Sequence, residues 1–132
     1  MRFILDTHVL IWWCIGSNKL SRRYADLLSS SASPSSPLAL SGISLWEIAK
    51  LVERGRLKTP IAVDVLLERL EKHPTLVVLP LSASIVLRST RMGASYPHDP
   101  ADQIIGATAL CHGLQLLTED TGIRRSGLVP VV

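Results

Sequence analysis

The chain has 132 residues, which suits one domain of ordinary size, and 47% of them are apolar, enough to bury a core. No apolar stretch approaches the roughly 20 residues that a membrane-spanning helix needs, so the composition argues against a membrane protein. The formal net charge of +3, from 14 Lys and Arg against 11 Asp and Glu, permits a nucleic acid partner without requiring one.

The N-terminal apolar run is interrupted by Asp6 and His8 and lacks the small-residue cleavage site of a signal peptide. We therefore expect mature, folded chain that works in the cytoplasm. Cys14 and Cys111 form neither a CxxC pair nor a zinc pattern, and we expect both to be reduced residues of the core. A mean hydropathy of +0.30 favours some apolar surface that a partner protein or a second copy covers.

The first third of the chain begins with a predicted buried strand at residues 2–5, which ends at Asp6. A short apolar helix is predicted at residues 9–15, and a second helix at residues 21–30. Residues 29–37 (SSSASPSSP) are rich in Ser and Pro. We expect a flexible loop there rather than a domain linker, because the residues before it are too few to fold alone.

The middle of the chain continues with a short predicted strand at residues 38–41. Residues 44–54 carry apolar side chains at helical spacing and are followed by Gly55, which predicts a helix. Another helix is predicted to open at Thr59-Pro60 and to run to about residue 73. A strand at residues 76–79 follows.

The last third contains a predicted helix at residues 83–92 and a longer one that begins at Asp99-Pro100 and runs to Gly113. A strand is predicted at residues 114–117, and a final extended segment at residues 129–132. Short apolar strands thus alternate with helices. This pattern predicts an α/β sandwich around a mainly parallel sheet, with residues 1–132 as a single domain.

Four acidic residues stand where predicted strands end or helices begin, and they are called the four acids below: Asp6, Glu47, Asp102 and Asp120. In an open parallel sheet such positions gather at the carboxyl edge. Two carboxylates at about 4 Å repel by about 4 kcal/mol at an effective dielectric near 20, so a cluster must protonate or bind a cation. Hard oxygen ligands of this kind suit Mg²⁺ or Mn²⁺.

Each of these acids also has a purely structural alternative. Glu47 stands three residues after Ser44, which is a capping-box spacing. The segment Asp99-Pro100-Ala101-Asp102 has the residues of a helix start, with an N-cap, a proline and an acid in the first turn. Asp6 and Asp120 could cap a helix or begin a turn. The conjunction of all four, with Asp6 closing a buried strand, favours the metal site.

Five sequence blocks follow one another nearly from end to end. They are residues 5–13 (LDTHVLIWW), 44–49 (SLWEIA), 55–57 (GRL), 98–109 (HDPADQIIGATA) and 117–120 (LTED). In this order they resemble the PIN-domain ribonucleases, specifically VapC-type toxins of bacterial type II toxin–antitoxin pairs. The resemblance implies a PIN-like three-layer α/β/α sandwich with a mainly parallel central sheet.

The same resemblance implies that the four acids are both metal ligands and catalytic residues of an endoribonuclease that cuts RNA with Mg²⁺ or Mn²⁺ and an activated water. Thr118 would support the metal site through its hydroxyl, and Asp99 would assist, ranking below Asp102. The implied partners are an RNA substrate, a cognate antitoxin protein and a second copy of the chain. Gln103 departs from the family, which commonly has Arg or Lys there.

Basic residues share a helical face with one of the four acids. Lys50 and Arg54 stand three and seven residues after Glu47, and Arg56 and Lys58 extend the basic region. One interpretation is a stripe that follows the RNA backbone. The alternative is a solvated face with weak local charge pairs.

The tryptophans Trp12, Trp13 and Trp46 could stack on bases, but a place in the core or in a dimer interface is the favoured interpretation. His8 and His98 flank acids and could act as acid–base groups, although a supporting hydrogen bond is the simpler role.

Three other kinds of protein compete with the nuclease. A PIN-like module that binds RNA or protein without cutting is one, and the intact set of four acids weighs against it. A phosphatase with an aspartate nucleophile would want a second acid two residues after Asp6, where this chain has His8. A receiver domain would want a lysine after a late strand, and the last predicted strands offer none.

Overall fold

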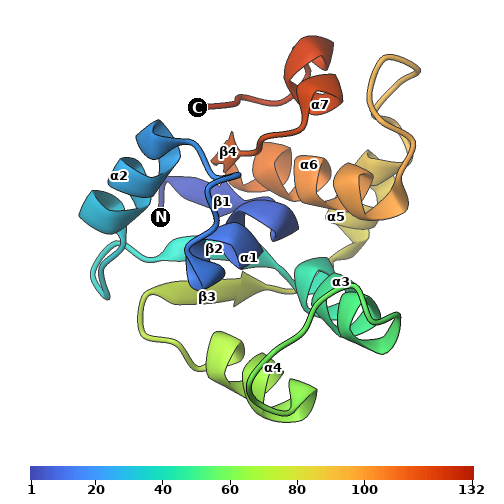
Figure 1. Cartoon of the computed structure of the whole chain (residues 1–132). Helices are drawn as coiled ribbons and strands as arrows, with labels where there is room; N and C mark the ends of the chain where they lie inside the picture. Colours follow the sequence, from blue (N-terminus) through green and yellow to red (C-terminus); the bar gives the residue numbers. More distant parts are fainter.

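The computed structural model describes residues 1–132 and places four parallel strands between two groups of helices (Figure 1). The elements in chain order are β1 (Phe3–Leu5), α1 (Thr7–Ile15), α2 (Arg22–Ser31), β2 (Leu38–Ser41), α3 (Gly42–Glu53), α4 (Val63–Glu71), β3 (Leu76–Leu79), α5 (Ala83–Ser89), α6 (Pro100–His112), β4 (Gln115–Leu117) and α7 (Thr121–Ser126). The predicted alternation of strands and helices is confirmed.

The sheet has the strand order β3-β2-β1-β4, and all three pairings are parallel. Leu5, at the end of β1, lies in register with Leu40 of β2 and with Leu117 of β4. The carboxyl ends of these three strands therefore meet at one edge of the sheet. The residues that follow them in sequence begin their helices or turns at that edge.

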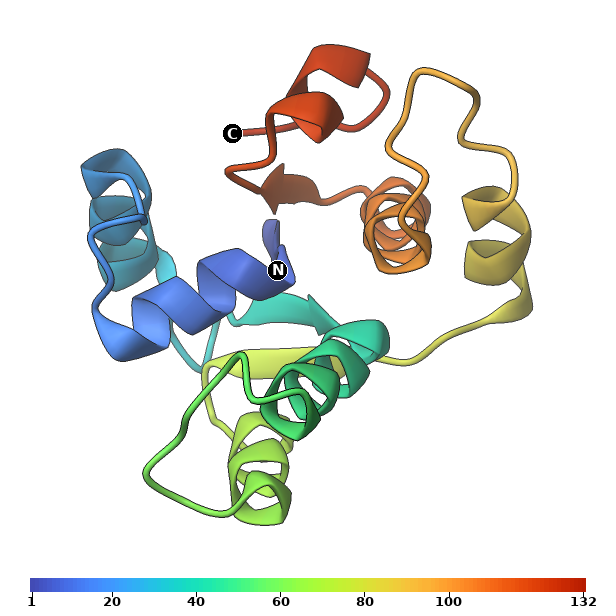
Figure 2. The same ribbon diagram turned by 45° about the vertical axis from the view of Figure 1, so that its right-hand side comes forward.

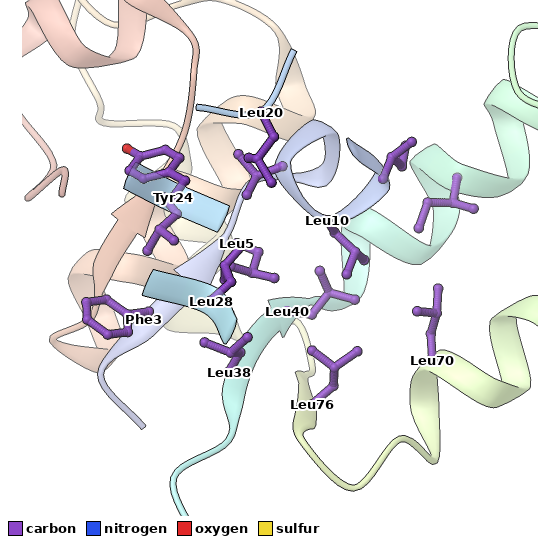
Figure 3. Packing of buried hydrophobic residues seen from close by; sticks show 14 residues of the cluster. Phe3, Leu5, Leu10, Leu20, Tyr24, Leu28, Leu38, Leu40, Leu70 and Leu76 are labelled. Carbon is purple, nitrogen blue, oxygen red and sulfur yellow. The ribbon is translucent and has the colours of Figure 1, made fainter. Parts of the chain in front are cut away.

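Successive strand residues point to opposite faces of the sheet, and both faces are covered. Leu5 and Leu40 belong to an apolar cluster with residues from α1 and α2, and Figure 3 shows their side chains with those of Leu10 and Leu28. Ile4 belongs to a second cluster, with residues from α5, α6 and α7. Figure 2 shows α1 and α2 on one side of the sheet and α5 and α6 on the other. This is the expected α/β/α sandwich.

Several predicted boundaries were wrong. α3 begins at Gly42, because Ser41 is its N-cap and accepts a hydrogen bond from the backbone NH of Ile43. Ser44 therefore lies inside the helix and does not cap it, and Glu47 lies in the second turn. α4 begins at Val63, three residues after Pro60.

Other differences concern chain segments at the ends of elements. α5 ends at Ser89, three residues earlier than predicted. α2 continues to Ser31, and the remaining Ser/Pro segment makes a short turn in which the NH of Ser36 donates to the carbonyl of Ser33. The expected C-terminal strand is reduced to an isolated bridge between Val131 and Leu116.

The expected burial of the two cysteines was wrong, and of the two places expected for the tryptophans, Trp46 does not occupy the core. Cys14 and Cys111 are free thiols, as expected, but both are exposed at the surface rather than buried in the core. Trp46 is 54% exposed and is no core residue, whereas Trp12 and Trp13 are partly buried against the first apolar cluster. No helix in the structure has the length and apolarity needed to cross a membrane.

Candidate active site

The four acids surround one cavity of about 310 Å³ at the carboxyl edge of the sheet, called the acid cavity below. β1 and β4 lead into the segments that carry Asp6 and Asp120, α3 carries Glu47, and the start of α6 carries Asp102. The residues that line the cavity are Asp6, His8, Trp12, Glu47, Asp99, Asp102, Glu119 and Asp120. Residues up to 114 positions apart in sequence thus come together.

Asp6 is the most buried of the acids, with 5% of its surface exposed. It occupies the N-cap position of α1, but its side chain makes no capping hydrogen bond. Instead, the hydroxyl of Thr118 donates to Asp6 Oδ2 over 2.7 Å and accepts from the NH of Asp120 over 3.0 Å. Burial raises the pKa of Asp6, and the hydrogen bond from Thr118 opposes that rise. Thr118 therefore links two of the four acids.

Glu47 is held by residues of two helices. The hydroxyl of Thr7, at the start of α1, donates to Glu47 Oε1 over 2.5 Å and lies 2.8 Å from the hydroxyl of Ser44. Burial is also the main cause that raises the pKa of Glu47, and the hydrogen bond from Thr7 opposes it. Thr7 and Ser44 are buried and so position this carboxylate.

Asp99 and Asp102 divide two roles at the start of α6. Asp99 Oδ1 accepts hydrogen bonds from the NH groups of Ala101 (2.9 Å) and Asp102 (3.1 Å), so the predicted N-cap is confirmed. The Asp102 carboxyl makes no such bond, and burial together with the negative charge of Asp6 raises its pKa to about 7. Tyr96 donates its hydroxyl proton to the carbonyl oxygen of Asp102 and fixes this turn.

Asp120 is exposed and caps the short helix α7, where its Oδ1 accepts from the NH of Ile123 over 2.9 Å. The structural alternative for this acid is therefore correct. It does not exclude a second role, because Asp120 also lines the acid cavity and its charge contributes to the raised pKa of both Asp6 and Asp102.

The donor set of the acid cavity suits a hard divalent cation, since carboxylate oxygens dominate its lining. The structure has no group of three or more His, Cys, Asp or Glu side chains already arranged as a metal's ligands. Mg²⁺ typically takes only one or two protein carboxylates and keeps several waters, so it requires no such complete cage. Burial is the main cause that raises the pKa of Asp6 and of Asp102, and the negative charge of neighbouring carboxylates raises both further, which a cation would relieve.

The basic residues divide between different surfaces. Lys50 and Arg54 line a second groove that shares Glu47 and Asp99 with the acid cavity. Lys58 lines a separate apolar groove, and Arg56 is exposed outside all of these hollows. The predicted basic stripe is thus reduced to two residues beside the acid cavity.

Some residues that shape the site were not singled out from the sequence. Thr7 and Ser44 stand within the recognised sequence blocks, but only the contact between α1 and α3 shows their role. Tyr24 and Arg124 donate to the carbonyl oxygen of Thr118 from opposite ends of the chain. Those contacts depend on tertiary packing and leave no local signal.

Fold and site together define an α/β protein whose parallel sheet carries a carboxylate-lined cavity at its carboxyl edge. The family model described as the PIN domain matches residues 3–127. The chain is 34% identical over 121 residues to Ribonuclease VapC22 of Mycobacterium tuberculosis, across 92% of this chain and 88% of that relative. The chain therefore belongs to the PIN-domain family.

Solved structures show the same fold. The structure of FitAcB from Neisseria gonorrhoeae is similar with a TM-score of 0.70 and 26% identity, over 98% of this chain and 96% of that one. A toxin–antitoxin complex from Klebsiella pneumoniae is similar with a TM-score of 0.68 and 25% identity, over 99% and 96% of the two chains. The PIN-like fold that the sequence blocks implied is confirmed.

Proposed function

We propose that this protein is an endoribonuclease that acts as the toxin of a toxin–antitoxin pair, and that the four acids hold Mg²⁺ or Mn²⁺ for the reaction. The observation that carries the proposal is the convergence of these carboxylates on one cavity at the carboxyl edge of the sheet. The similarity to a VapC ribonuclease over most of the chain supports RNA as the substrate.

Asp6, Glu47 and Asp102 are the principal metal ligands in this proposal, with Asp120 at the outer side of the cavity. When bound, a divalent cation supplies activation of a water molecule and neutralises charge that develops on the phosphodiester oxygens. The chain's own part is to hold the carboxylates in place. Thr118 and Thr7 do so by hydrogen bonds to Asp6 and Glu47, and the cap at Asp99 fixes the turn that carries Asp102.

The test is cleavage of structured RNA with Mg²⁺ or Mn²⁺, with and without EDTA, for the wild type, Asp6→Asn and Glu71→Gln. Glu71 is an exposed acid at the end of α4, away from the cavity, and so controls for the loss of one charge. We expect EDTA to abolish cutting and Asp6→Asn to slow it by about 100-fold or more, because metal stabilisation is worth several kcal/mol. Glu71→Gln should cut normally.

Cutting that persists in EDTA or in Asp6→Asn would contradict the metal mechanism. RNA binding by the wild type without cutting of any RNA, in either metal, would instead favour the PIN-like binding module.

We further infer that a cognate antitoxin covers an apolar groove beside the site. This groove lies between α1, α3 and α4, and apolar side chains from all three helices line it, including Ile11, Ile48 and Leu66. Ile15 also lines it and is 63% exposed, which is costly for an apolar side chain unless a partner covers it. Ile15→Lys should weaken capture of the co-expressed antitoxin without slowing RNA cleavage, and unchanged capture would exclude this groove.

We also propose that the protein is a homodimer and that it works in the cytoplasm. Residues 1–132 form one domain in this proposal. Leu81, Val86 and Leu87, on α5 and just before it, are all about half exposed and offer an apolar patch for a second copy. Light scattering should give the mass of a dimer for the wild type and of a monomer for Leu87→Lys. A monomeric wild type would contradict the dimer.

A further inference from the structure

A groove of about 210 Å³ runs beside the acid cavity and is lined mainly by one face of α3. Glu47 and Asp99 line both hollows, so the groove adjoins the cavity. The groove is also lined by Trp46, Lys50 and Arg54, and it is called the Trp46 groove below. A polymer that crosses the acid cavity can therefore continue directly into it.

Trp46 is the unusual side chain of this groove. Its ring is 54% exposed although it is the largest apolar side chain of α3. Lys50, one turn further along the helix, has its Nζ 5.8 Å from the centre of the Trp46 ring. No buried contact of the fold requires an indole at this position, because Trp46 belongs to neither apolar cluster.

The charges of the groove are arranged along the helix. Glu47 faces the acid cavity, while Lys50 and Arg54 lie progressively further from it, with Arg54 about 10 Å along the helix axis from Glu47. Lys50 Nζ also contacts Glu53 Oε1 at 3.0 Å, but this pair is on the surface and so is weak. The far end of the groove thus offers positive charge, and the Trp46 ring, 5.8 Å from Lys50 Nζ, offers an aromatic face beside it.

We propose that the Trp46 groove binds a nucleotide of single-stranded RNA next to the bond that is cut, with Trp46 stacked on the base and Lys50 and Arg54 contacting the flanking phosphates. This inference rests on the proposed function, since it places RNA across the acid cavity. An aromatic face beside cations is the usual arrangement for single-stranded nucleic acid, because every base can stack and every nucleotide carries a phosphate.

The charges along the groove determine where successive phosphates of the substrate lie. A phosphate cannot rest beside Glu47 and Asp99 without a cation between them, but it can rest beside Lys50 and Arg54. The reacting phosphate therefore lies in the acid cavity, and the next one lies beside Lys50 and Arg54. The base of that nucleotide is not stacked on a neighbouring base on the side that meets Trp46, as a single strand allows.

The test measures binding rather than cleavage. A fluorescein-labelled short single-stranded RNA is titrated with protein in Ca²⁺, and a gel run afterwards checks that the RNA is intact. We compare the wild type with Trp46→Ala, Trp46→Phe and Lys50→Gln. Leu128→Ala serves as the control, because it also shortens a partly exposed apolar side chain, after α7 and outside the groove. A second oligomer of the same length carries abasic sugars.

We expect Trp46→Ala to weaken binding of the RNA by about 5- to 100-fold, and Trp46→Phe to restore most of it, since stacking tolerates any aromatic ring. Binding of the abasic oligomer should be weak and equal for the wild type and Trp46→Ala. Lys50→Gln should reduce the slope of log Kd against log salt by about 0.7, the value for one phosphate contact on a single strand. Leu128→Ala should bind as the wild type does.

Equal RNA affinity of the wild type and Trp46→Ala would overturn the inference. So would an equal loss for the abasic oligomer, which would show that Trp46 does not contact a base. Trp46 also lines an apolar hollow with Ile43 and Leu81, so light scattering on Trp46→Ala is included. A dimer that falls apart in this variant would assign Trp46 to a contact between copies instead.

Weaker capture of the antitoxin by Trp46→Ala, with RNA affinity unchanged, would assign the groove to that partner. Base-dependent binding by Trp46 without cleavage in Mg²⁺ or Mn²⁺ would sink the proposed nuclease while leaving this inference standing. Metal-dependent cleavage, with RNA binding unchanged by Trp46→Ala, would support the proposed nuclease and overturn this inference.

Discussion

Single hydroxyl groups position the carboxylates of the acid cavity. The Thr118 side chain bridges Asp6 and the backbone of Asp120, and Thr7 reaches Glu47 from the start of a different helix. Because Asp6 and Thr118 are both buried, no water can replace this hydrogen bond without a change in packing. The positions of the Asp6 and Glu47 carboxylates are therefore each set by a specific donor.

Thr118→Val keeps the shape of this side chain but removes its hydroxyl. It leaves Asp6 Oδ2 and the NH of Asp120 without their partner, so we expect a loss of about 1–3 kcal/mol in the free energy of unfolding. RNA cleavage should fall by about 10- to 100-fold, as for other residues that hold metal ligands. Thr118→Ser, which keeps the hydroxyl, should restore both. Full cleavage activity in Thr118→Val would show that Asp6 does not depend on this donor.

Substitutions of Asp99 can separate its role as the N-cap of α6 from a role as a metal ligand. Serine also caps helices well, so Asp99→Ser should keep the unfolding free energy within about 0.5 kcal/mol, whereas Asp99→Ala should lose about 1 kcal/mol. Since Asp99 Oδ1 already accepts from two NH groups as the cap of α6, we expect Asp99→Ser to retain most of the cleavage activity. Chemical denaturation and an RNA cleavage assay give the two readouts. A loss of activity as large as that of Asp102→Asn would make Asp99 a metal ligand.

At the scale of elements, close packing of α6 against the loop that precedes it holds Asp102 at the cavity. Gly106 lies against the buried ring of Tyr96, and a Cβ at this position would come within 2.3 Å of the Tyr96 hydroxyl oxygen. That same hydroxyl donates to the carbonyl of Asp102. Gly106 therefore leaves room for Tyr96, and Tyr96 fixes the turn that carries Asp102.

Gly106→Ala consequently strains the Tyr96 ring, which is 1% exposed and cannot move into solvent. We expect a loss of about 1–3 kcal/mol in unfolding free energy from overpacking, together with slower RNA cleavage. Gly106→Ala combined with Tyr96→Phe should recover part of the stability, because Phe lacks the clashing oxygen. Unchanged stability of the single variant in thermal denaturation would contradict this packing account.

Sequence reasoning predicts elements better than it predicts their ends. The apolar run of β1 and the cap at Asp99 are local signals, and both elements are confirmed. The start of α3 was misplaced because Ser41 and Ser44 are equally good caps by type, and only the end of β2 decides between them. The roles of Thr7, Ser44 and Tyr24 depend on contacts between distant elements, so no local pattern could reveal them.

At the scale of the whole molecule, the parallel sheet brings negative charges together at one edge at a cost in stability. The Asp102 pKa is raised from its ordinary 3.8 to about 7 in the folded chain, and those of Asp6 and Glu47 are raised as well. The folded state therefore binds more protons than the unfolded state in this range. Protonation favours the folded chain below about pH 4, and this contribution disappears as the pH rises through about 7.

Without a metal, the wild type should lose stability relative to Asp102→Asn as the pH is raised from about 4 to about 7. The asparagine side chain does not titrate, so the difference between the two isolates the Asp102 carboxyl. Urea denaturation of both proteins in EDTA across this pH range is the measurement. In Mg²⁺ the wild type should recover the lost stability and Asp102→Asn should recover less. A stability difference that does not change with pH would contradict the raised pKa.

The central claim is that the four acids together hold a divalent cation, and Mn²⁺ binding tests it most directly. Free Mn²⁺ is followed by its electron paramagnetic resonance signal in titrations of the wild type, Asp102→Asn and Glu71→Gln, with no RNA present. We predict saturable binding by the wild type and by Glu71→Gln, and binding at least about 10-fold weaker by Asp102→Asn. Equal Mn²⁺ affinity in all three proteins, or no binding by the wild type, would contradict the account.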